Sequence, residues 1–366
     1  MPCTKKPFDI DTSKPVLVTG ATGYIAGVLI HQLLDKGVTV HATVRDPSKK
    51  DRLQYLQDLA DKSSGSIKFF KANLTDSGSF EEAMQGCYAV FHTASPFTGN
   101  FQDAQKELIE PAVQGTKNVL LTCNKVSSVK RVVVTSSCAA VITDCWECRP
   151  DVPTDENTWN RTTSLTRMPY CLSKTMAEQA AWTIAGSQTQ WRLCTINPSL
   201  VIGPGVKYHA SSESFTLMKS LGSKDDPNNA LGVANLGLGV VDVRDVASAH
   251  IAAAYLDDAG GRYICSAHNT SLPELAQSIG NKYYPEYPIV MRTIPNFLMP
   301  LIWLLAPYTG QGIDRTFVRG NWGYKPNFDH SKMERELGME FRPLNESIQE
   351  MFQQFIDNKA IQPCKK

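Results

Sequence analysis

A short apolar run, Val16–Val18, leads directly into Thr19-Gly-Ala-Thr-Gly-Tyr-Ile-Ala26, and a segment of helical period follows. In such a G-x-x-G-x-x-A turn the first Gly permits a tight turn, and the second lets the backbone approach a pyrophosphate. The N-terminus of the following helix then faces the phosphates. The motif therefore predicts a dinucleotide site at the chain's first strand-to-helix junction. The expected contacts in this motif are Gly20, Gly23, Tyr24 and Ile25.

Over the first two hundred residues, short β-branched runs alternate with longer segments whose apolar residues recur every three or four positions. This rhythm is typical of a parallel sheet with crossover helices. We therefore predict an α/β fold with a Rossmann-type, doubly wound parallel sheet and a smaller C-terminal substrate-binding lobe. The expected strands are Pro15–Thr19, Thr39–Val44, Ile67–Lys71, Ala89–Thr93, Arg131–Thr135, Arg192–Asn197 and, later, Arg262–Cys265.

The alternation weakens beyond Asn197 and returns near Val240. We expect an N-terminal arm at 1–14 and an NADP-binding domain at 15–202, to which 240–266 returns. The substrate-binding lobe then comprises 203–239 and 267–366. The apolar segment Ile294–Pro307 is shorter than the ~20 residues of a membrane span and holds three prolines, so we expect no stable membrane insertion.

The charge balance argues against a nucleic-acid partner. There are 37 Lys and Arg against 36 Asp and Glu, a net charge of +1, without a basic stripe. The first residues lack the apolar core of a secretory signal, and the ten cysteines are scattered without a disulfide spacing. We therefore expect a cytoplasmic protein with reduced thiols, present as a monomer or homodimer. No second C-x-x-C exists to complete a zinc site with Cys145 and Cys148. We expect this pair on a surface loop, and redox tuning of the nearby pocket is the alternative.

The second expected strand ends at Val44, and Arg45 follows where an NAD-binding fold commonly has an acidic residue. A guanidinium there can form paired, charged hydrogen bonds to a 2′-phosphate. Lys49 and Arg52 can add to the same cluster from the next helix. These residues predict NADPH as the cofactor, although Asp46 leaves room for NAD.

Tyr170-Cys-Leu-Ser-Lys174 places a phenol and an ammonium four residues apart at the start of an expected helix, so that they share one face. The unperturbed pKa of Tyr is ~10, and a neighbouring Lys stabilises the phenolate and lowers that pKa. Such a Tyr can protonate a carbonyl oxygen while hydride reaches the carbon. Ser136 and Ser137 end the fifth strand, where a hydroxyl can polarise the same oxygen; spacing alone does not separate them.

Together these motifs resemble the extended short-chain dehydrogenases/reductases, in the branch of plant dihydroflavonol reductases, cinnamoyl-CoA reductases and fungal aldehyde or methylglyoxal reductases. The resemblance covers nearly the whole chain. It is carried by Thr-Gly-Ala-Thr-Gly-Tyr-Ile-Ala, Thr-Val-Arg-Asp-Pro, Phe-His-Thr-Ala-Ser-Pro, Val-Thr-Ser-Ser, Tyr-Cys-Leu-Ser-Lys, Asn-Pro-Ser-Leu-Val-Ile-Gly-Pro and Val-Asp-Val-Arg-Asp-Val-Ala-Ser-Ala-His.

The resemblance implies reduction of a ketone or aldehyde with NADPH. Ser137 would orient the substrate oxygen, Tyr170 would donate the proton, and Lys174 would lower the pKa of Tyr170 and hold the ribose. It also implies contacts to the cofactor along its length. These are Arg45 and Arg52 at the 2′-phosphate, Asn73 and Leu74 beside the adenine, and Thr93, Ala94 and Ser95 along the ribose and diphosphate. Lys174 would lie at the nicotinamide ribose, Pro198 and Val201 would flank the nicotinamide, Ser214 would contact a phosphate, and Tyr170 would be a further cofactor contact.

Three positions depart from the family's pattern. Asn73 stands where relatives usually have Asp, and its amide oxygen can still accept a hydrogen bond. Ile142 stands where dihydroflavonol reductases commonly carry Asn, five residues after the catalytic Ser, which argues against a flavonoid substrate. Met168-Pro-Tyr-Cys-Leu replaces the Trp-Tyr-Cys-Tyr of cinnamoyl-CoA reductases, which argues against a CoA thioester. A small or medium carbonyl compound remains.

Two other functions stay open. One is a 3β-hydroxysteroid dehydrogenase/isomerase-like enzyme or a sugar-nucleotide epimerase/dehydratase of the same superfamily. The other is a nonenzymatic NADPH-sensing protein, which would need no proton donor and therefore neither Tyr170 nor Lys174.

Overall fold

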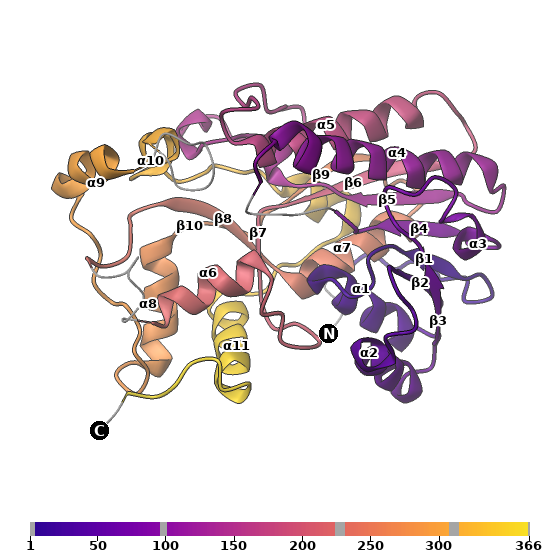
Figure 1. The fold of residues 1–366 in the computed structure, drawn as a ribbon, viewed down its shortest axis with the longest axis horizontal. Coiled ribbons are helices and arrows are strands. Elements are labelled where there is room, and N and C mark those ends of the chain that lie inside the picture. The colour runs from indigo at the N-terminus through magenta and orange to yellow at the C-terminus, as the bar shows by residue number, and fades with distance from the viewer. Residues whose placement is uncertain (1–3, 96–100, 224–230, 307–314, 365–366) are drawn as a thin grey trace.

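The computed structural model has seven parallel strands in one sheet, in the order β3-β2-β1-β4-β5-β6-β9 (Figure 1). It describes residues 4–95, 101–223, 231–306 and 315–364. The strand order reverses between β1 and β4, which is the switch point where ligands of such sheets bind. The Rossmann-type prediction is confirmed, and each strand end differs from its predicted position by at most one residue. The strands are β1 (Val16–Val18), β2 (Thr39–Val44), β3 (Ser66–Lys71), β4 (Ala89–His92), β5 (Arg131–Thr135), β6 (Arg192–Pro198) and β9 (Gly261–Cys265).

Helices cover both faces of this sheet, which is why the central strands β1 and β4 are apolar and buried on both sides, whereas the edge strand β3 is partly exposed. Along β1 the side chains alternate: Val16 and Val18 pack with the helices of one face, and Leu17 packs with those of the other. Figure 1 shows the two helical layers. One layer holds α1 (Tyr24–Asp35), α2 (Lys50–Lys62) and α7 (Val243–Tyr255); the other holds α3 (Glu81–Met84), α4 (Glu110–Lys125) and α5 (Pro169–Ala185).

A smaller sheet, in the order β10-β8-β7, lies beside the first. Strand β8 pairs parallel with β7 and antiparallel with β10, and it leads directly into α7, which packs on α1. Parts of the predicted arm and lobe (1–3, 224–230, 307–314 and 365–366) lie outside the described residues. The smaller part holds β7 (Leu200–Ile202), β8 (Gly237–Asp242), β10 (His268–Ser271), α6 (Glu213–Leu221), α8 (Leu272–Tyr283), α9 (Met299–Leu305), α10 (Arg315–Asn321) and α11 (Leu344–Asp357).

The apolar segment that begins at Ile294 forms the short helix α9, and Pro307 lies outside the described residues. Leu301, Leu304 and Leu305 are exposed on this helix. Within the described ranges, the helices are too short or too polar to cross a membrane.

The prediction that Cys145 and Cys148 form a surface pair is wrong. Both thiols are buried: the Cys145 Sγ donates to the Gly237 carbonyl at 3.2 Å, and the Cys148 Sγ accepts from the Thr154 hydroxyl at 3.4 Å. The segment after Ser137 folds inward against the smaller sheet and takes these side chains with it. Burial raises the pKa of the Cys145 thiol to about 12, so the thiol is protonated and unreactive at neutral pH.

Candidate active site

The glycine loop between β1 and α1 is packed tightly against the end of β4. Gly20 has a φ of +66°, and a Cβ at this position would lie 2.9 Å from the Ala94 Cβ. A Cβ on Gly23 would lie 3.2 Å from the Gly20 carbonyl oxygen. The loop therefore requires Gly at position 20 for its backbone and for its contact with Ala94, as the motif predicts for a phosphate-binding turn.

Beside this loop lies a cavity of about 600 Å³ at the carboxyl ends of β1, β2 and β4. Its volume falls in the range of cofactor sites. Eight of the predicted cofactor contacts line it: Gly20, Gly23, Arg45, Asn73, Leu74, Thr93, Ala94 and Ser95. It is also lined by residues that the motifs did not single out, Thr22, Thr43, Val44, Ala72, Thr75, Phe80, Glu107 and Pro111.

The other predicted contacts lie outside this lining. The Tyr24 side chain turns into the core, where its hydroxyl donates to the Gly203 carbonyl and its ring meets Phe215 edge-on. Its backbone and that of Ile25 begin α1, next to the cavity. The remaining predicted nicotinamide and phosphate contacts lie on β6, β7 and α6: Pro198 and Val201 are buried, and Ser214 is half-buried.

Basic side chains gather beyond the end of β2. Arg45 and Arg52 are exposed, and the Lys49 ammonium lies 3.7 Å from the Asp46 carboxylate. The loop after β7 adds Lys207, whose ammonium lies 4.0 Å from the centre of the Tyr55 ring. Burial and the nearby charge of Arg52 lower the pKa of Lys207. Lys207 escaped the sequence analysis because it is about 150 residues away from α2 in the chain and belongs to no motif.

Helix α5 carries the predicted catalytic pair at its start. Pro169 occupies its first turn, and Met168 before it has a left-handed backbone with φ of 50°. Such a backbone conformation costs energy for any residue other than Gly. It persists only where the surrounding packing enforces it, and it is common at functional sites. Two residues after Met168, the Tyr170 side chain meets Ser137, which follows the end of β5.

Tyr170 and Ser137 are joined by a side-chain hydrogen bond. Burial raises the pKa of Tyr170 above its ordinary value of 10.0, while this hydrogen bond lowers it. The nearby Glu213 carboxylate on α6 also raises the pKa. Lys174 lies one helical turn on, with its ammonium 5.8 Å from the centre of the Tyr170 ring. The sequence predicted that Lys174 lowers the pKa of Tyr170. In the structure burial raises this pKa instead, so the phenol is protonated at neutral pH.

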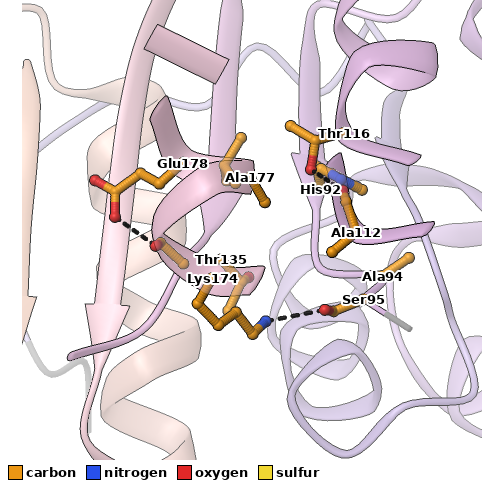
Figure 2. A pocket seen from close by; sticks show the side chains of 11 residues that line it. His92, Ala94, Ser95, Ala112, Thr116, Thr135, Lys174, Ala177 and Glu178 are labelled. Atoms are coloured by element: carbon orange, nitrogen blue, oxygen red, sulfur yellow. Dashed lines mark hydrogen bonds between the residues drawn. The ribbon is translucent and has the colours of Figure 1, made fainter. Parts of the chain in front are cut away.

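The Lys174 ammonium donates to the Ser95 hydroxyl at 2.9 Å and so joins α5 to the segment that follows β4 (Figure 2). Burial lowers the pKa of Lys174 to about 8. Behind the ammonium lies a small cavity of about 20 Å³, lined in part by His92, Thr135 and Glu178. A space of this size is on the scale of one water molecule.

The structure distinguishes the two candidate serines. Ser136 is buried, and its hydroxyl donates to the Glu178 carboxylate at 2.5 Å. The Ser137 hydroxyl accepts from the Ala139 amide at 3.1 Å and also meets Tyr170. Neighbouring residues on extended backbone point to opposite sides, so the two hydroxyls cannot share one role.

Comparisons with known proteins agree with this architecture. Cinnamoyl-CoA reductase CAD2 from Medicago truncatula is 36% identical over 349 residues, which cover 94% of this chain and 96% of that protein. A (2S)-flavan-3-ol-forming anthocyanidin reductase from Vitis vinifera is 39% identical over 285 residues, or 75% of this chain and 82% of that protein. The crystal structure of Gre2 from Candida albicans in complex with NADPH superposes with a TM-score of 0.76 at 29% identity, covering 94% of this chain and 99% of that one.

These relatives confirm the resemblance to extended short-chain dehydrogenases/reductases. The family model described as "NAD dependent epimerase/dehydratase family" matches residues 16–265, which include the glycine loop and the Tyr170 helix. The chain belongs to the NAD dependent epimerase/dehydratase family.

Proposed function

We propose that this protein reduces a ketone or aldehyde to an alcohol with NADPH as the hydride donor. The observation that carries the proposal is the hydrogen bond between Ser137 and Tyr170, with Lys174 one turn away on the same helix. Ser137 follows the end of β5, and the other two side chains come from α5, so the three lie at the carboxyl edge of the sheet, where substrates of such folds bind.

The cavity beside the glycine loop fits a dinucleotide. Gly20 and Gly23 leave room for a pyrophosphate at the start of α1, and Arg45 lies at the cavity's edge with its guanidinium exposed. Arg52 would add a second positive charge, and Lys174 would hold the nicotinamide ribose. NADPH bound there would supply the hydride that the carbonyl carbon receives.

The chain's own residues account for the proton. Tyr170 is protonated at neutral pH because burial raises its pKa, so it is in the form that a general acid needs. Ser137 and Tyr170 would bind the substrate oxygen together, and Tyr170 would release its proton to that oxygen as negative charge develops there. The Ser137 hydrogen bond and the positive charge of Lys174 would stabilise the phenolate that remains.

The apolar surroundings of Ile142 favour a substrate that has no polar ring substituent for this position to bind. Ile142 is buried in an apolar cluster with Val141, Ile264 and Phe328. Although relatives are named for cinnamoyl-CoA and anthocyanidin substrates, this position and the sequence around Tyr170 point to a small or medium aldehyde or ketone.

The proposal is tested by NADPH oxidation with the purified protein against aldehydes, α-dicarbonyls, ketones and steroids, with cinnamoyl-CoA and flavonoid substrates for comparison. We expect turnover of aldehydes or ketones, with NADPH preferred over NADH. A protein that turns over none of the panel, or that retains stoichiometric NAD and shows no net oxidation, would exclude the proposal. Equal or better turnover with NADH would remove its cofactor assignment.

A further inference from the structure

Glu178 is a buried carboxylate that the proposed reaction does not use. It lies on α5, two turns after Tyr170, and is 1% exposed. Its two oxygens accept hydrogen bonds from five side chains. The donors are Arg262 Nε at 2.6 Å, Thr195 Oγ1 at 3.0 Å and Trp182 Nε1 at 3.3 Å to Oε1, and Ser136 Oγ at 2.5 Å and Asn197 Nδ2 at 2.7 Å to Oε2.

Arg262 on β9 is the charged partner, and it is 8% exposed. Its remaining guanidinium nitrogens fasten the segment that follows Ser137. NH1 donates to the carbonyls of Glu156 and Thr158 at 2.8 and 2.6 Å, and the guanidinium carbon lies 3.8 Å from the centre of the Trp159 ring. Arg262 thereby holds both Glu178 and the chain that leaves the catalytic serine.

The donors to Glu178 connect directly to Ser137. Ser136 precedes it in the chain, and Asn197 on β6 donates to the Ser137 carbonyl at 3.2 Å as well as to Glu178. The backbone of Ser137 is therefore held on both sides by groups that the Glu178 carboxylate orients.

On α5, Tyr170, Lys174 and Glu178 follow at intervals of four residues, so they lie along one stripe of the helix. Each meets a different part of the sheet edge. Figure 2 shows Lys174 reaching toward Ser95, while the Glu178 carboxylate points in a different direction. A slide of the helix by one residue, ~1.5 Å, would break the Glu178 contacts and separate Tyr170 from Ser137.

We propose that Glu178, charge-paired with Arg262 and bonded to Ser136, is a positioning residue that fixes α5 against the end of β5 and so aligns Tyr170 with Ser137. This inference rests on the proposed carbonyl reduction. A contribution to stability does not explain why Glu178 and Arg262 form a buried ion pair, because such pairs can often be replaced by apolar residues without loss of stability. Alignment of Tyr170 with Ser137 does explain the pair, since a misplacement of ~1 Å at reacting groups can lower the rate by ~100-fold.

The test variants are Glu178→Gln and Ser136→Ala. Glu178→Gln removes the charge and places an amide NH2 group against a group that itself donates, such as the Arg262 guanidinium or the Asn197 amide NH2. It also leaves the Arg262 charge buried and unpaired, which can prevent folding. Ser136→Ala keeps the ion pair between Glu178 and Arg262 and deletes the hydroxyl that joins Glu178 to the end of β5. Its matched control is Ser278→Ala in α8, which deletes a buried hydroxyl that donates to Asn345 at 2.6 Å in the other part of the molecule.

For Ser136→Ala we expect kcat to fall by roughly tenfold, with the KM and Kd for NADPH unchanged. Hydrogen exchange of the amides from Tyr170 to Glu178 should rise in this variant and stay at the wild-type rate in Ser278→Ala. A purely structural role would lower the melting temperature of both variants and change neither kcat nor this local exchange, which would overturn the inference. If the wild-type protein reduces no carbonyl, the proposed function fails, and the exchange of the α5 amides alone decides whether Glu178 fixes the helix.

Discussion

The Lys174 ammonium donates to the Ser95 hydroxyl at 2.9 Å and bridges α5 to the segment after β4. This bond connects the cavity beside the glycine loop, which Ser95 lines, with the helix that carries Tyr170. Burial lowers the pKa of this lysine to about 8.

The pH dependence of the reaction should follow from this lysine. Because the charged form predominates below about pH 8, we expect kcat/KM for the carbonyl substrate to be level through neutral pH and to fall as pH rises through that value. A pH profile of the wild-type enzyme measures this. The residual activity of Lys174→Arg should show the falling limb displaced to higher pH, because Arg stays charged. A wild-type profile that is flat well above pH 8 would show that Lys174 need not be charged.

Gly20→Ala should both destabilise the protein and weaken NADPH binding. The substitution forces a side chain onto a backbone with φ of +66° and places its Cβ 2.9 Å from the Ala94 Cβ. Gly86→Ala is the matched control, because Gly86 has a φ of +75° but its Cβ would meet nothing within 4 Å. Urea unfolding should show Gly20→Ala to be about 1–3 kcal/mol less stable than Gly86→Ala, a difference due to overpacking. Equal losses in both variants and unchanged NADPH binding would mean that the contact with Ala94 does not shape the site.

Arg45→Ala should weaken NADPH binding and leave NADH binding unchanged. A charge-assisted hydrogen bond contributes about 1.5–3 kcal/mol, which corresponds to roughly 10–100-fold in the Kd for NADPH. Arg335→Ala is a suitable control, since Arg335 is exposed and lies in the short π-helix Met333–Leu337 that precedes α11. Titration of both cofactors by protein fluorescence distinguishes the cases. Parallel losses for NADPH and NADH in Arg45→Ala would argue against a contact with the 2′-phosphate.

Local patterns were sufficient to predict the parts of this protein that depend on neighbours in sequence. The β-branched runs gave the parallel strands, and the Gly20 turn and the Tyr170 helix were placed correctly because each is encoded within a few residues. Residue spacing could not distinguish Ser136 from Ser137, because their roles depend on which side of an extended backbone each hydroxyl occupies.

Contacts between distant segments could not be predicted in the same way. Glu178 and Arg262 are 84 residues apart, and neither belongs to a motif that links them. The burial of Cys145 likewise depends on how the segment after Ser137 folds onto β8, and the raised pKa of Tyr170 depends on how closely α5 is covered. The order of residue types along the chain does not show such long-range contacts, the burial that they cause or the pKa shifts that follow from it.

The protein should lose stability in mild acid. Burial lowers the pKa of His92 to about 3 and of His209 and His250 to about 4. Since the unfolded state takes up these protons near pH ~6.5 and the folded state does not, stability is full above that pH and declines as pH falls toward the folded pKa values. Each histidine contributes up to ~1.4 kcal/mol per pH unit to this decline.

His250→Gln should flatten this acid dependence in urea unfolding at neutral pH and at about pH 5. Its ring is buried between the Thr135 hydroxyl at 2.6 Å and the Val246 carbonyl at 2.7 Å. His31→Gln on α1 is the control, because it removes a histidine whose side chain remains in contact with solvent. Identical pH slopes for the two variants would contradict this account of acid sensitivity.

The central claim is that Tyr170 donates the proton, and kcat of Tyr170→Phe tests it most directly. The matched control is Tyr255→Phe, since the buried Tyr255 hydroxyl has no hydrogen-bond partner among the described residues. With a carbonyl substrate and saturating NADPH, we expect kcat of Tyr170→Phe to fall by ~10²–10⁴-fold, with the Kd for NADPH near the wild-type value and Tyr255→Phe fully active. A Tyr170→Phe variant that binds NADPH normally and retains most of the wild-type kcat would show that another group supplies the proton.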